Sequence, residues 1–250
     1  MRWNSVAIRR HSGSLTVICG SMFSGKTEEL IRLVRRSMHA RKKVQVFKSS
    51  LDTRCDTTVI RTHDDTRFNA IAISSAAEME ALLDIGVQVV GIEEVQFLDE
   101  AVVDLCMRLA DSGVDVFAAG LDQDFRATPF SFMPRLMALA DNVMKLHAIC
   151  KVCGEEASRT QRLVNGKPAS WDEPTILIGA DESYEARCRK CHIVRNAPTS
   201  VPTRRKKRQT PYPANDKVEP ASKPRAPAPA MPSDAVETDA DLQLTMFADA

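Results

Sequence analysis

The chain has 250 residues, of which 44% are hydrophobic, 27% charged and only 5% aromatic. Its 34 Lys and Arg nearly balance its 33 Asp and Glu, so the net charge of +1 argues against a globally basic nucleic-acid-binding protein. No run approaches the roughly 18 apolar residues of a membrane-spanning helix, and the apolar part of the basic N-terminus is too short for a signal peptide. Seven cysteines leave one over in any scheme of disulfides, which favours a reducing cytoplasm where some of them bind metal.

Short β-branched apolar runs alternate with amphipathic segments in the first half of the chain. The pattern predicts, in chain order, a strand over 15–19, a helix over 27–39, a strand over 44–47, a helix over 75–83, a strand over 87–92, a helix over 99–110 and a strand over 114–118. Ser75 followed by Glu78 is typical of a capping box. Residues 50–68 contain no such run and predict a long loop, of a length that usually serves a site. The alternation favours an α/β fold, with a parallel sheet covered on both faces.

A phosphate-binding loop is predicted between the first strand and the first helix. The segment that matches its pattern consists of Gly20, Ser21, Met22, Phe23, Ser24, Gly25, Lys26 and Thr27. Glycines allow backbone N–H groups to wrap a β-phosphate, and the helix N-terminus favours the anion. Lys26 can reach the β- and γ-phosphates, while the Thr27 hydroxyl can bind Mg²⁺. The alternative is a chance match in a turn, but the strand–loop–helix context favours a site for a nucleoside triphosphate.

Two adjacent carboxylates, Glu93 and Glu94, follow the third predicted strand. Ligands of parallel sheets bind beyond the carboxyl ends of the strands, where these side chains would lie. One of them can hold Mg²⁺, and the other can orient or deprotonate a nucleophile. The alternative is an ordinary solvated helix start, where acids are common.

Two Cys-x-x-Cys pairs predict a structural zinc site, with Cys150, Cys153, Cys188 and Cys191 as ligands. Their separation is longer than usual, and an inserted hairpin over 164–167 accounts for the excess. A redox dithiol and unrelated buried cysteines are the alternatives, and His192 could replace Cys191 as the fourth ligand. Cys19 and Cys106 lie on apolar faces and are predicted to be core residues, whereas Cys55 has no predicted partner.

Composition changes near Asn196, where a tail rich in proline and devoid of glycine begins. Such a segment cannot repay the entropy of ordering, so we expect disorder. The sequence thus predicts a P-loop NTPase-type parallel sheet flanked by helices, plus a small ribbon-like zinc-binding domain. The predicted boundaries are an N-terminal extension over 1–13, the α/β domain over 14–148, the zinc-binding domain over 149–196 and the tail over 197–250.

These motifs together resemble those of the type II thymidine kinases, the family of the human cytosolic enzyme and its bacterial and viral relatives. The likeness runs from about Gly13 to Val194. The matching segments, in family order, are 20–27, 52–54, 62–64, 93–97, 120–126, 129–130 and the two cysteine pairs. The chain departs from the family pattern at Glu93, where aspartate is usual, and at Val95, Ala127 and Ala180, but no functional group is lost.

The resemblance implies an ATP-dependent kinase that phosphorylates thymidine to give dTMP in nucleotide salvage. Deoxyuridine is a further candidate substrate. Glu94 would be the base that takes the proton from the thymidine 5′-hydroxyl, and Glu93 would help Thr27 hold Mg²⁺. Arg54 would stabilise charge on the transferring phosphoryl group, beside Lys26. The resemblance also implies feedback inhibition by dTTP and a homotetramer.

A nucleoside pocket is implied in the same way, lined by Met22, Phe97, Leu121, Phe125, Thr160, Leu177, Gly179 and Tyr184. The chain between Thr160 and Tyr184 would form a lasso-like loop that clasps the base. Phe125 and Tyr184 offer flat apolar faces that suit a pyrimidine. Phe97 and Leu121 could instead be ordinary core residues.

The tail carries two further patterns. A basic run over 204–208 fits either a nucleic-acid or localisation patch or a solvated charge run. The final residues Gln243, Leu244, Met246 and Phe247 resemble the short peptides by which bacterial replication proteins dock into the sliding clamp. A rival to the kinase hypothesis is an ATP-binding module that binds DNA through its zinc element. The cations near the cysteines that would contact DNA are Arg187, Arg189, Lys190 and Arg195.

Overall fold

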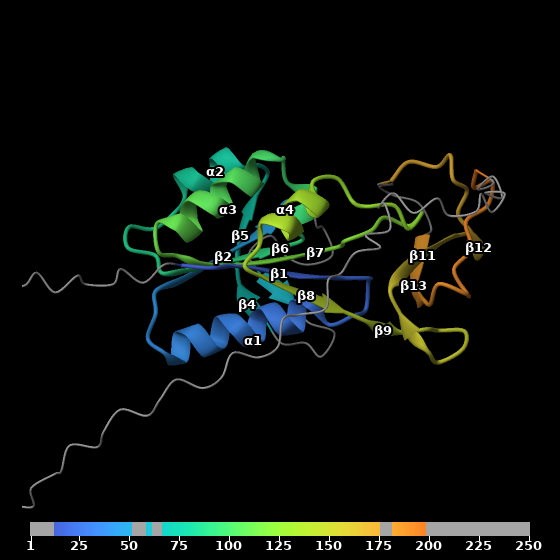
Figure 1. The fold of residues 1–250 in the computed structure, drawn as a ribbon, viewed down its shortest axis with the longest axis horizontal. Coiled ribbons are helices and arrows are strands. Elements are labelled where there is room, and N and C mark those ends of the chain that lie inside the picture. Colours follow the sequence, from blue (N-terminus) through green and yellow to red (C-terminus); the bar gives the residue numbers. More distant parts are fainter. Residues whose placement is uncertain (1–12, 52–58, 62–66, 176–181, 199–250) are drawn as a thin grey trace, which may run out of the picture. The chain divides into compact units, whose positions relative to one another are not determined.

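A computed structural model of the chain describes residues 13–51, 59–61, 67–175 and 182–198. Its centre is a six-stranded sheet in which each pair of neighbours is parallel (Figure 1). The strands lie in the order β5 (Ile71–Ile73), β2 (Val44–Ser49), β6 (Val89–Glu93), β7 (Asp115–Gly120), β1 (Leu15–Gly20) and β8 (Asn142–Leu146). The predicted α/β fold with a parallel sheet is therefore confirmed.

Helices cover both faces of this sheet (Figure 1). One face carries α1 (Lys26–His39), and the other carries α2 (Ala76–Ala81), α3 (Ala101–Asp111) and α4 (Met133–Leu139). A single 3-10 turn, η1 (Val95–Phe97), follows β6. Among the residues that the structure describes, none of these helices has the length and apolar character to cross a membrane.

The core is divided between the two faces because neighbouring side chains on a strand point in opposite directions. Ile18 of β1 and Ala119 of β7 pack with Leu30 and Val34 of α1. Val17, next to Ile18, belongs instead to the larger cluster beneath α2, α3 and α4. Each of these five side chains is at most 1% exposed, and burial of such apolar surface contributes most of the stability of the sheet.

The parallel register brings the carboxyl ends of the strands to one edge. Lys48 of β2 is paired with Glu93 of β6, and Cys19 of β1 is paired with Gly120 of β7. The loops that leave β1, β6 and β7 therefore start side by side, where ligands of such sheets bind.

The chain after the main sheet forms two small antiparallel sheets. One contains β9 (Ala148–Ile149) and β10 (Glu156–Ala157), and the other contains β12 (Lys167–Pro168), β11 (Arg159–Val164) and β13 (Glu182–Arg187). Val164 pairs with Lys167 across a two-residue turn, in which Asn165 and Gly166 have φ values of 50° and 71°. The predicted hairpin is thus present, with the Asn-Gly turn that left-handed backbone favours.

Two sequence-based expectations are corrected by the structure. Residues 50–68 are not a plain loop, because β3 (Val59–Arg61) and β4 (Arg67–Asn69) form an antiparallel pair. Three-residue strands are too short to show a periodic pattern. The capping box is also only half formed: the Ser75 hydroxyl accepts from the Glu78 N–H at 3.2 Å, but the Glu78 carboxylate binds Ser74.

Candidate active site

The phosphate loop leaves β1 in a conformation that its glycines permit. Gly20 has a φ of +144°, and a Cβ there would lie 2.3 Å from the backbone oxygen of Leu146 on β8. Gly25 has a φ of +83° and caps α1. The Lys26 side chain is only 7% exposed, and its Nζ donates to the backbone oxygen of Ser21 at 2.9 Å. The amine therefore lies over the loop whose N–H groups would bind phosphate.

A hydroxyl and a carboxylate meet next to this loop. Thr27 Oγ1, in the first turn of α1, donates to Glu93 Oε1 at 2.6 Å across 66 positions of sequence. Glu93 is the last residue of β6 and is 4% exposed. Hydroxyl and carboxylate oxygens are the ligands that Mg²⁺ takes in nucleotide sites, so this pair fits the predicted metal.

Glu94 has an unusual backbone and a fixed carboxylate. Its φ of 52° is rare for a residue with a side chain, and strain of this kind is typical of functional sites. Glu94 Oε2 accepts from Gln96 Nε2 at 2.5 Å, and Gln96 Oε1 accepts from the Leu121 N–H at 3.1 Å. A Cβ on Gly120 would lie 2.5 Å from that same Gln96 oxygen, so a side chain there would displace the Gln96 amide. The sequence assigned no role to Gln96, whose only signal was its place in the 93–97 motif.

The phosphate loop is tied to the small sheet through Thr160 of β11. The Met22 N–H donates to Thr160 Oγ1 at 3.0 Å, and Ser21 Oγ donates to the Ala157 oxygen at 3.3 Å. Strand pairing places Tyr184 of β13 opposite Arg162 of β11. Because side chains two positions apart share a face, Thr160, Arg162 and Tyr184 lie on the same side of this sheet. The hydrogen bond to Thr160 therefore brings Met22 to the face of this small sheet that carries Thr160 and Tyr184.

Three predicted pocket residues follow β6 and β7. Phe97 meets Phe130 edge-on with ring centroids 5.8 Å apart, and both Phe97 and Leu121 pack half-buried against the larger core. Phe125 is 4% exposed. Of the other predicted residues, Arg54, Leu177 and Gly179 lie outside the described residues, as do the tail and its clamp-like peptide.

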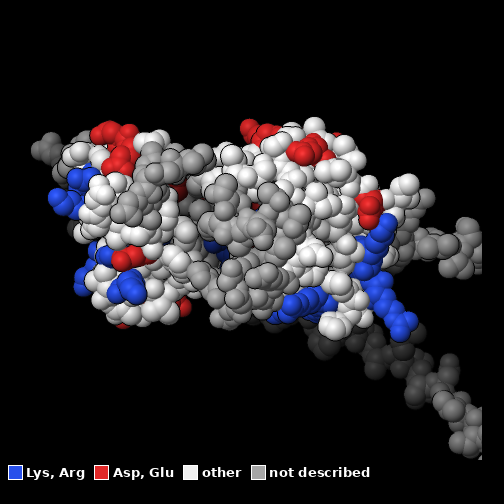
Figure 2. All heavy atoms as spheres, turned by 180° about the vertical axis from the view of Figure 1, so that it is seen from behind, with Lys and Arg blue, Asp and Glu red and all other residues white. Residues whose placement is uncertain are grey.

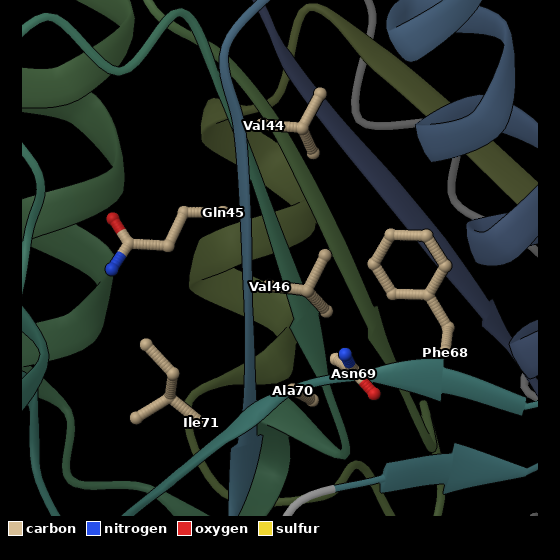
Figure 3. Close-up of a pocket in the computed structure, with 7 residues that line it drawn as sticks. All are labelled: Val44, Gln45, Val46, Phe68, Asn69, Ala70 and Ile71. Atoms are coloured by element: carbon tan, nitrogen blue, oxygen red, sulfur yellow. The ribbon is translucent and has the colours of Figure 1, made fainter.

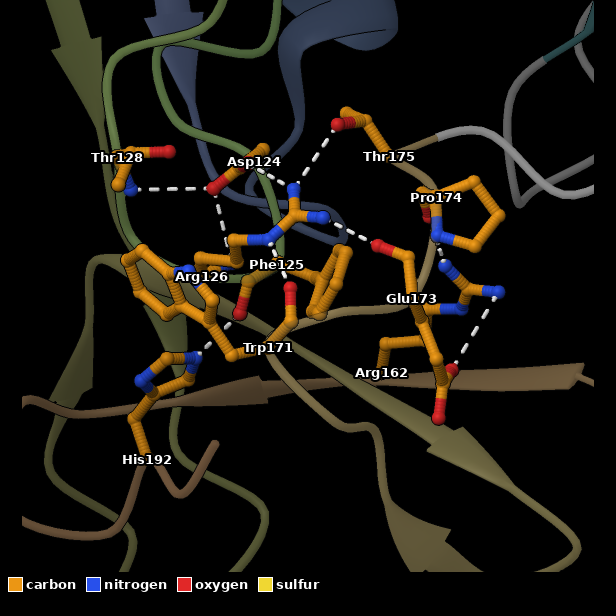
Figure 4. A network of polar contacts seen from close by, with 10 residues as sticks. All are labelled: Asp124, Phe125, Arg126, Thr128, Arg162, Trp171, Glu173, Pro174, Thr175 and His192. Carbon is orange, nitrogen blue, oxygen red and sulfur yellow. Dashed lines mark hydrogen bonds and ion pairs between the residues drawn. The ribbon is translucent and has the colours of Figure 1, made fainter. Parts of the chain in front are cut away.

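Phe125 is surrounded by a polar network (Figure 4). The Arg126 guanidinium lies 4.4 Å from the centroid of the Phe125 ring, and the Arg162 guanidinium lies 5.1 Å from it. Arg162 is fully buried and donates to the Pro174 oxygen at 2.6 Å. His192 Nε2 donates to the Phe125 oxygen at 2.8 Å, and burial lowers the pKa of this histidine. The sequence analysis gave none of these three basic side chains a role in the pocket.

The four paired cysteines converge on one point. The Sγ atoms of Cys150, Cys153, Cys188 and Cys191 all lie within 4.8 Å of one another, so these four sulfurs could hold a zinc ion. Burial opposes ionisation of Cys150, but backbone N–H groups of Cys188, Cys153 and Val152 outweigh it and lower the pKa of this thiol to about 6. The alternative with His192 as a ligand is not supported, because its Nε2 binds Phe125.

The chain that leaves the second cysteine pair is fastened to β11. Gln161 Nε2 donates to the Ile193 oxygen at 2.8 Å, and the Ile193 N–H donates back to Gln161 Oε1 at 2.9 Å. Together with the hydrogen bond from His192 to the Phe125 oxygen, these bonds connect the cysteine cluster to the residues around Thr160. No pattern in the sequence pointed to this role of Gln161.

Of the other three cysteines, Cys19 and Cys106 are core residues, and Cys55 lies outside the described residues. Cys19 and Cys106 are both fully buried, as expected from their apolar faces. Burial raises the pKa of Cys19 to about 11 and that of Cys106 to about 12, so neither thiol ionises near neutral pH.

A separate hollow of about 540 Å³ lies over β2, β4 and β5 (Figure 3). Its lining is Val44, Gln45, Val46, Phe68, Asn69, Ala70 and Ile71, which includes no charged or nucleophilic side chain. Figure 3 shows Gln45 and Ile71 on the opposite side of the β2 strand from Phe68.

Figure 2 shows charges of both signs on the face opposite that of Figure 1, with Lys and Arg gathered at its two ends.

Comparison with known families agrees with this geometry. A family model described as thymidine kinase matches residues 13–192. The matched range begins before β1, includes the phosphate loop, the Glu93–Glu94 pair and the Phe125 network, and ends just after the second cysteine pair. It covers well over half of the 250 residues, and we conclude that the chain belongs to the thymidine kinase family.

Proposed function

We propose that the protein transfers the γ-phosphate of ATP to the 5′-hydroxyl of thymidine, giving dTMP and ADP for nucleotide salvage. The observation that carries the proposal is the hydrogen bond between Thr27 and Glu93, with Glu94 as the next residue. It supports a site in which a phosphate loop, a magnesium donor pair and a second carboxylate would act together at one edge of the sheet. Membership of the thymidine kinase family supplies the class of substrate.

The triphosphate would bind over the loop from Gly20 to Thr27. Its backbone N–H groups and the N-terminus of α1 favour the phosphate oxygens, and Lys26 adds a cation that is already held over the loop. Thr27 and Glu93 would hold Mg²⁺, which when bound neutralises charge on the β- and γ-phosphates. We also assign Arg54 to the transferring phosphoryl group, on the resemblance alone.

Glu94 would act as the general base. As the 5′-oxygen of thymidine forms a bond to the γ-phosphorus, the hydroxyl proton passes to the Glu94 carboxylate and the bond from phosphorus to the ADP oxygen breaks. Gln96 holds one Glu94 oxygen at 2.5 Å and so orients the carboxylate for this transfer. A base whose orientation is already fixed by a hydrogen bond loses little conformational entropy on reaching the transition state.

The nucleoside would lie between the phosphate loop and the small sheet. The proposed lining is Met22, Phe97, Leu121, Phe125, Thr160, Leu177, Gly179 and Tyr184, of which Leu177 and Gly179 rest on the resemblance. The bond from Met22 to Thr160 supports this position, because it joins the two sides. The four-cysteine cluster has no open ligand position, so we assign its zinc a structural role.

Several finer properties remain proposals from the resemblance or from the tail. They are a cytoplasmic homotetramer, inhibition by dTTP, use of deoxyuridine and docking of Gln243, Leu244, Met246 and Phe247 into a sliding clamp. The rival DNA-gripping module is weakened by acidic partners of the cations around the second cysteine pair. Arg187 Nε binds Glu185 at 2.9 Å, and Arg195 lies 3.7 Å from Glu173, so two of its four cations have a carboxylate beside them.

The direct test incubates the purified full chain with Mg-ATP and each deoxynucleoside in turn and separates the products. We expect a monophosphate from thymidine and little or none from the purine deoxynucleosides. Failure to phosphorylate thymidine while another nucleoside is consumed would contradict the proposal. ATP hydrolysis stimulated by DNA, without any nucleoside product, would support the rival.

A further inference from the structure

The Arg126 side chain joins the loop that follows β7 to a segment that is distant in sequence (Figure 4). Its Nε donates to the Trp171 oxygen at 2.7 Å, and its Nη1 donates to Thr175 Oγ1 at 2.9 Å. A further bond runs from Nη2 to the Glu173 oxygen. One guanidinium thus holds three residues of segment 171–175 together.

The same guanidinium is fixed from its own side of the site. Nη1 lies 2.8 Å from Asp124 Oδ2, in an ion pair whose side chains are 15% and 7% exposed. Asp124 is held in turn, because its Oδ1 accepts from the N–H groups of Arg126 and Thr128 at 2.8 and 3.1 Å. A buried charge pair that also satisfies its remaining hydrogen bonds has one geometry, and so it orients whatever it contacts.

The ring of Phe125 lies against this fixed group. Arg126 stacks on it at 4.4 Å, and Arg162 contacts it at 5.1 Å. Guanidinium groups combine planar stacking with several hydrogen bonds, which an ammonium group cannot do. The orientation of Phe125 and the position of segment 171–175 therefore depend on the same side chain.

We propose that Arg126 is a positioning residue that sets the affinity of the site for its nucleoside. It holds Phe125 and segment 171–175 in the arrangement to which the nucleoside binds, and it takes no part in phosphoryl transfer. This inference rests on the proposed function, because Phe125 is there a wall of the nucleoside pocket. The side-chain bonds of Arg126 run to Asp124 and to segment 171–175, so binding of ATP is not expected to depend on it.

The test compares Arg126→Met and Arg126→Lys with the wild-type full chain. Loss of uniform binding raises KM without lowering kcat, so we expect KM for thymidine to rise about tenfold or more with kcat within about threefold. KM for ATP stays within about twofold in the same variants. Arg126→Lys keeps the positive charge but loses the planar group with several N–H donors. We therefore expect it to restore little of the affinity for thymidine. The matched control is Arg135→Met, which removes an exposed guanidinium paired with Glu100 and Asp104 and changes neither KM.

A second measurement does not depend on turnover. Deuterium exchange of the peptide covering 170–175, in protein without nucleoside, should be faster in both Arg126 variants, while the peptide covering 188–192 is unchanged. Faster exchange at 170–175 in the Arg126 variants, combined with a wild-type protein that fails to phosphorylate thymidine, would support the positioning role of Arg126 and refute the proposed function instead. Unchanged exchange at 170–175, an unchanged thymidine KM in Arg126→Met, or an equal rise of both KM values would overturn the inference.

Discussion

The side chains buried beneath the main sheet are mostly apolar, whereas those buried in the small sheet β12–β11–β13 include Thr160, Gln161 and Arg162. The apolar cluster near the cysteines is small, and its fully buried members are Ala148, Cys150, Ala157 and Ala186. Burial of apolar area therefore stabilises the first region. The second depends on specific hydrogen bonds and on the four cysteines.

This contrast teaches where each region is sensitive. An apolar core tolerates changes that conserve volume, but a buried polar network fails when one partner is removed, because the other partner keeps its desolvation cost. The proposed nucleoside pocket lies between the two regions, with Met22 from the first bonded to Thr160 of the second. Changes that separate the two regions should therefore affect nucleoside binding first.

The largest expected effect comes from metal removal. Because little apolar surface is buried around the cysteines, treatment with a chelator, or Cys153→Ser, should abolish amide protection in β9 to β13. Protection in β1, β6 and β7 should stay near its original value. Deuterium exchange followed by peptide resolves the two regions. Equal loss of protection in both would show that they are not independent.

A cavity in the main core should give the next largest effect. Leu30 is fully buried, so Leu30→Ala is expected to cost about 2–5 kcal/mol in the free energy of unfolding. Urea unfolding followed by circular dichroism measures it, and the loss should be global rather than confined to one face. Leu30→Met conserves volume and serves as the control, with a cost below about 1.5 kcal/mol. Similar values for the two variants would contradict the tight packing of α1.

A smaller effect is expected from a single amide bridge. Gln161→Leu leaves the part-buried N–H and C=O of Ile193 without their partner, and since about 1–3 kcal/mol is the cost of a fully buried unsatisfied group, we expect a smaller loss for each of them. Gln45 makes the matched bridge on the surface, between the Leu82 oxygen and the Asp84 N–H. Water can replace Gln45, so Gln45→Leu should cost less. The inference about the small sheet fails if Gln45→Leu is the more damaging change.

The smallest expected effect is that two buried thiols do not react with an alkylating reagent. Burial holds the pKa of Cys19 at about 11 and that of Cys106 at about 12, so both thiols stay protonated at pH 8 and should resist alkylation in the native protein. The four paired cysteines should become reactive once a chelator is added. Mass spectrometry of the alkylated peptides distinguishes the sites. Rapid labelling of Cys106 without denaturant would show that the α3 side of the core opens.

Local patterns were sufficient to predict the phosphate loop and β1, β2, β6 and β7 of the main sheet, but they predicted neither β5 nor β8. The apolar run over 15–19 becomes β1, the amphipathic pattern over 27–39 becomes α1, and Gly20 to Thr27 joins them as expected. The cysteine spacing likewise predicted a cluster that the structure forms. In these cases the interaction that fixes the structure lies within a few residues of the pattern.

Other features depend on partners far along the chain, which a local pattern does not reveal. Arg162 looks like a surface residue in sequence, but it is fully buried because the Pro174 oxygen and the Phe125 ring receive it. Gln96 acquires its role only when β7 brings the Leu121 N–H beside it. The β3–β4 hairpin was missed since each strand has three residues.

The central claim is that phosphoryl transfer to thymidine takes place at the edge formed by Thr27, Glu93 and Glu94. The most direct measurement follows thymidine-dependent transfer from ATP by the wild-type chain and by Glu94→Gln side by side, with the ATP affinity of each determined by calorimetry. We predict dTMP from the wild type, a fall in kcat of about 10²–10⁴ in the variant, and an unchanged affinity for ATP. A variant that forms dTMP at the wild-type rate would contradict the assignment of Glu94 as the base.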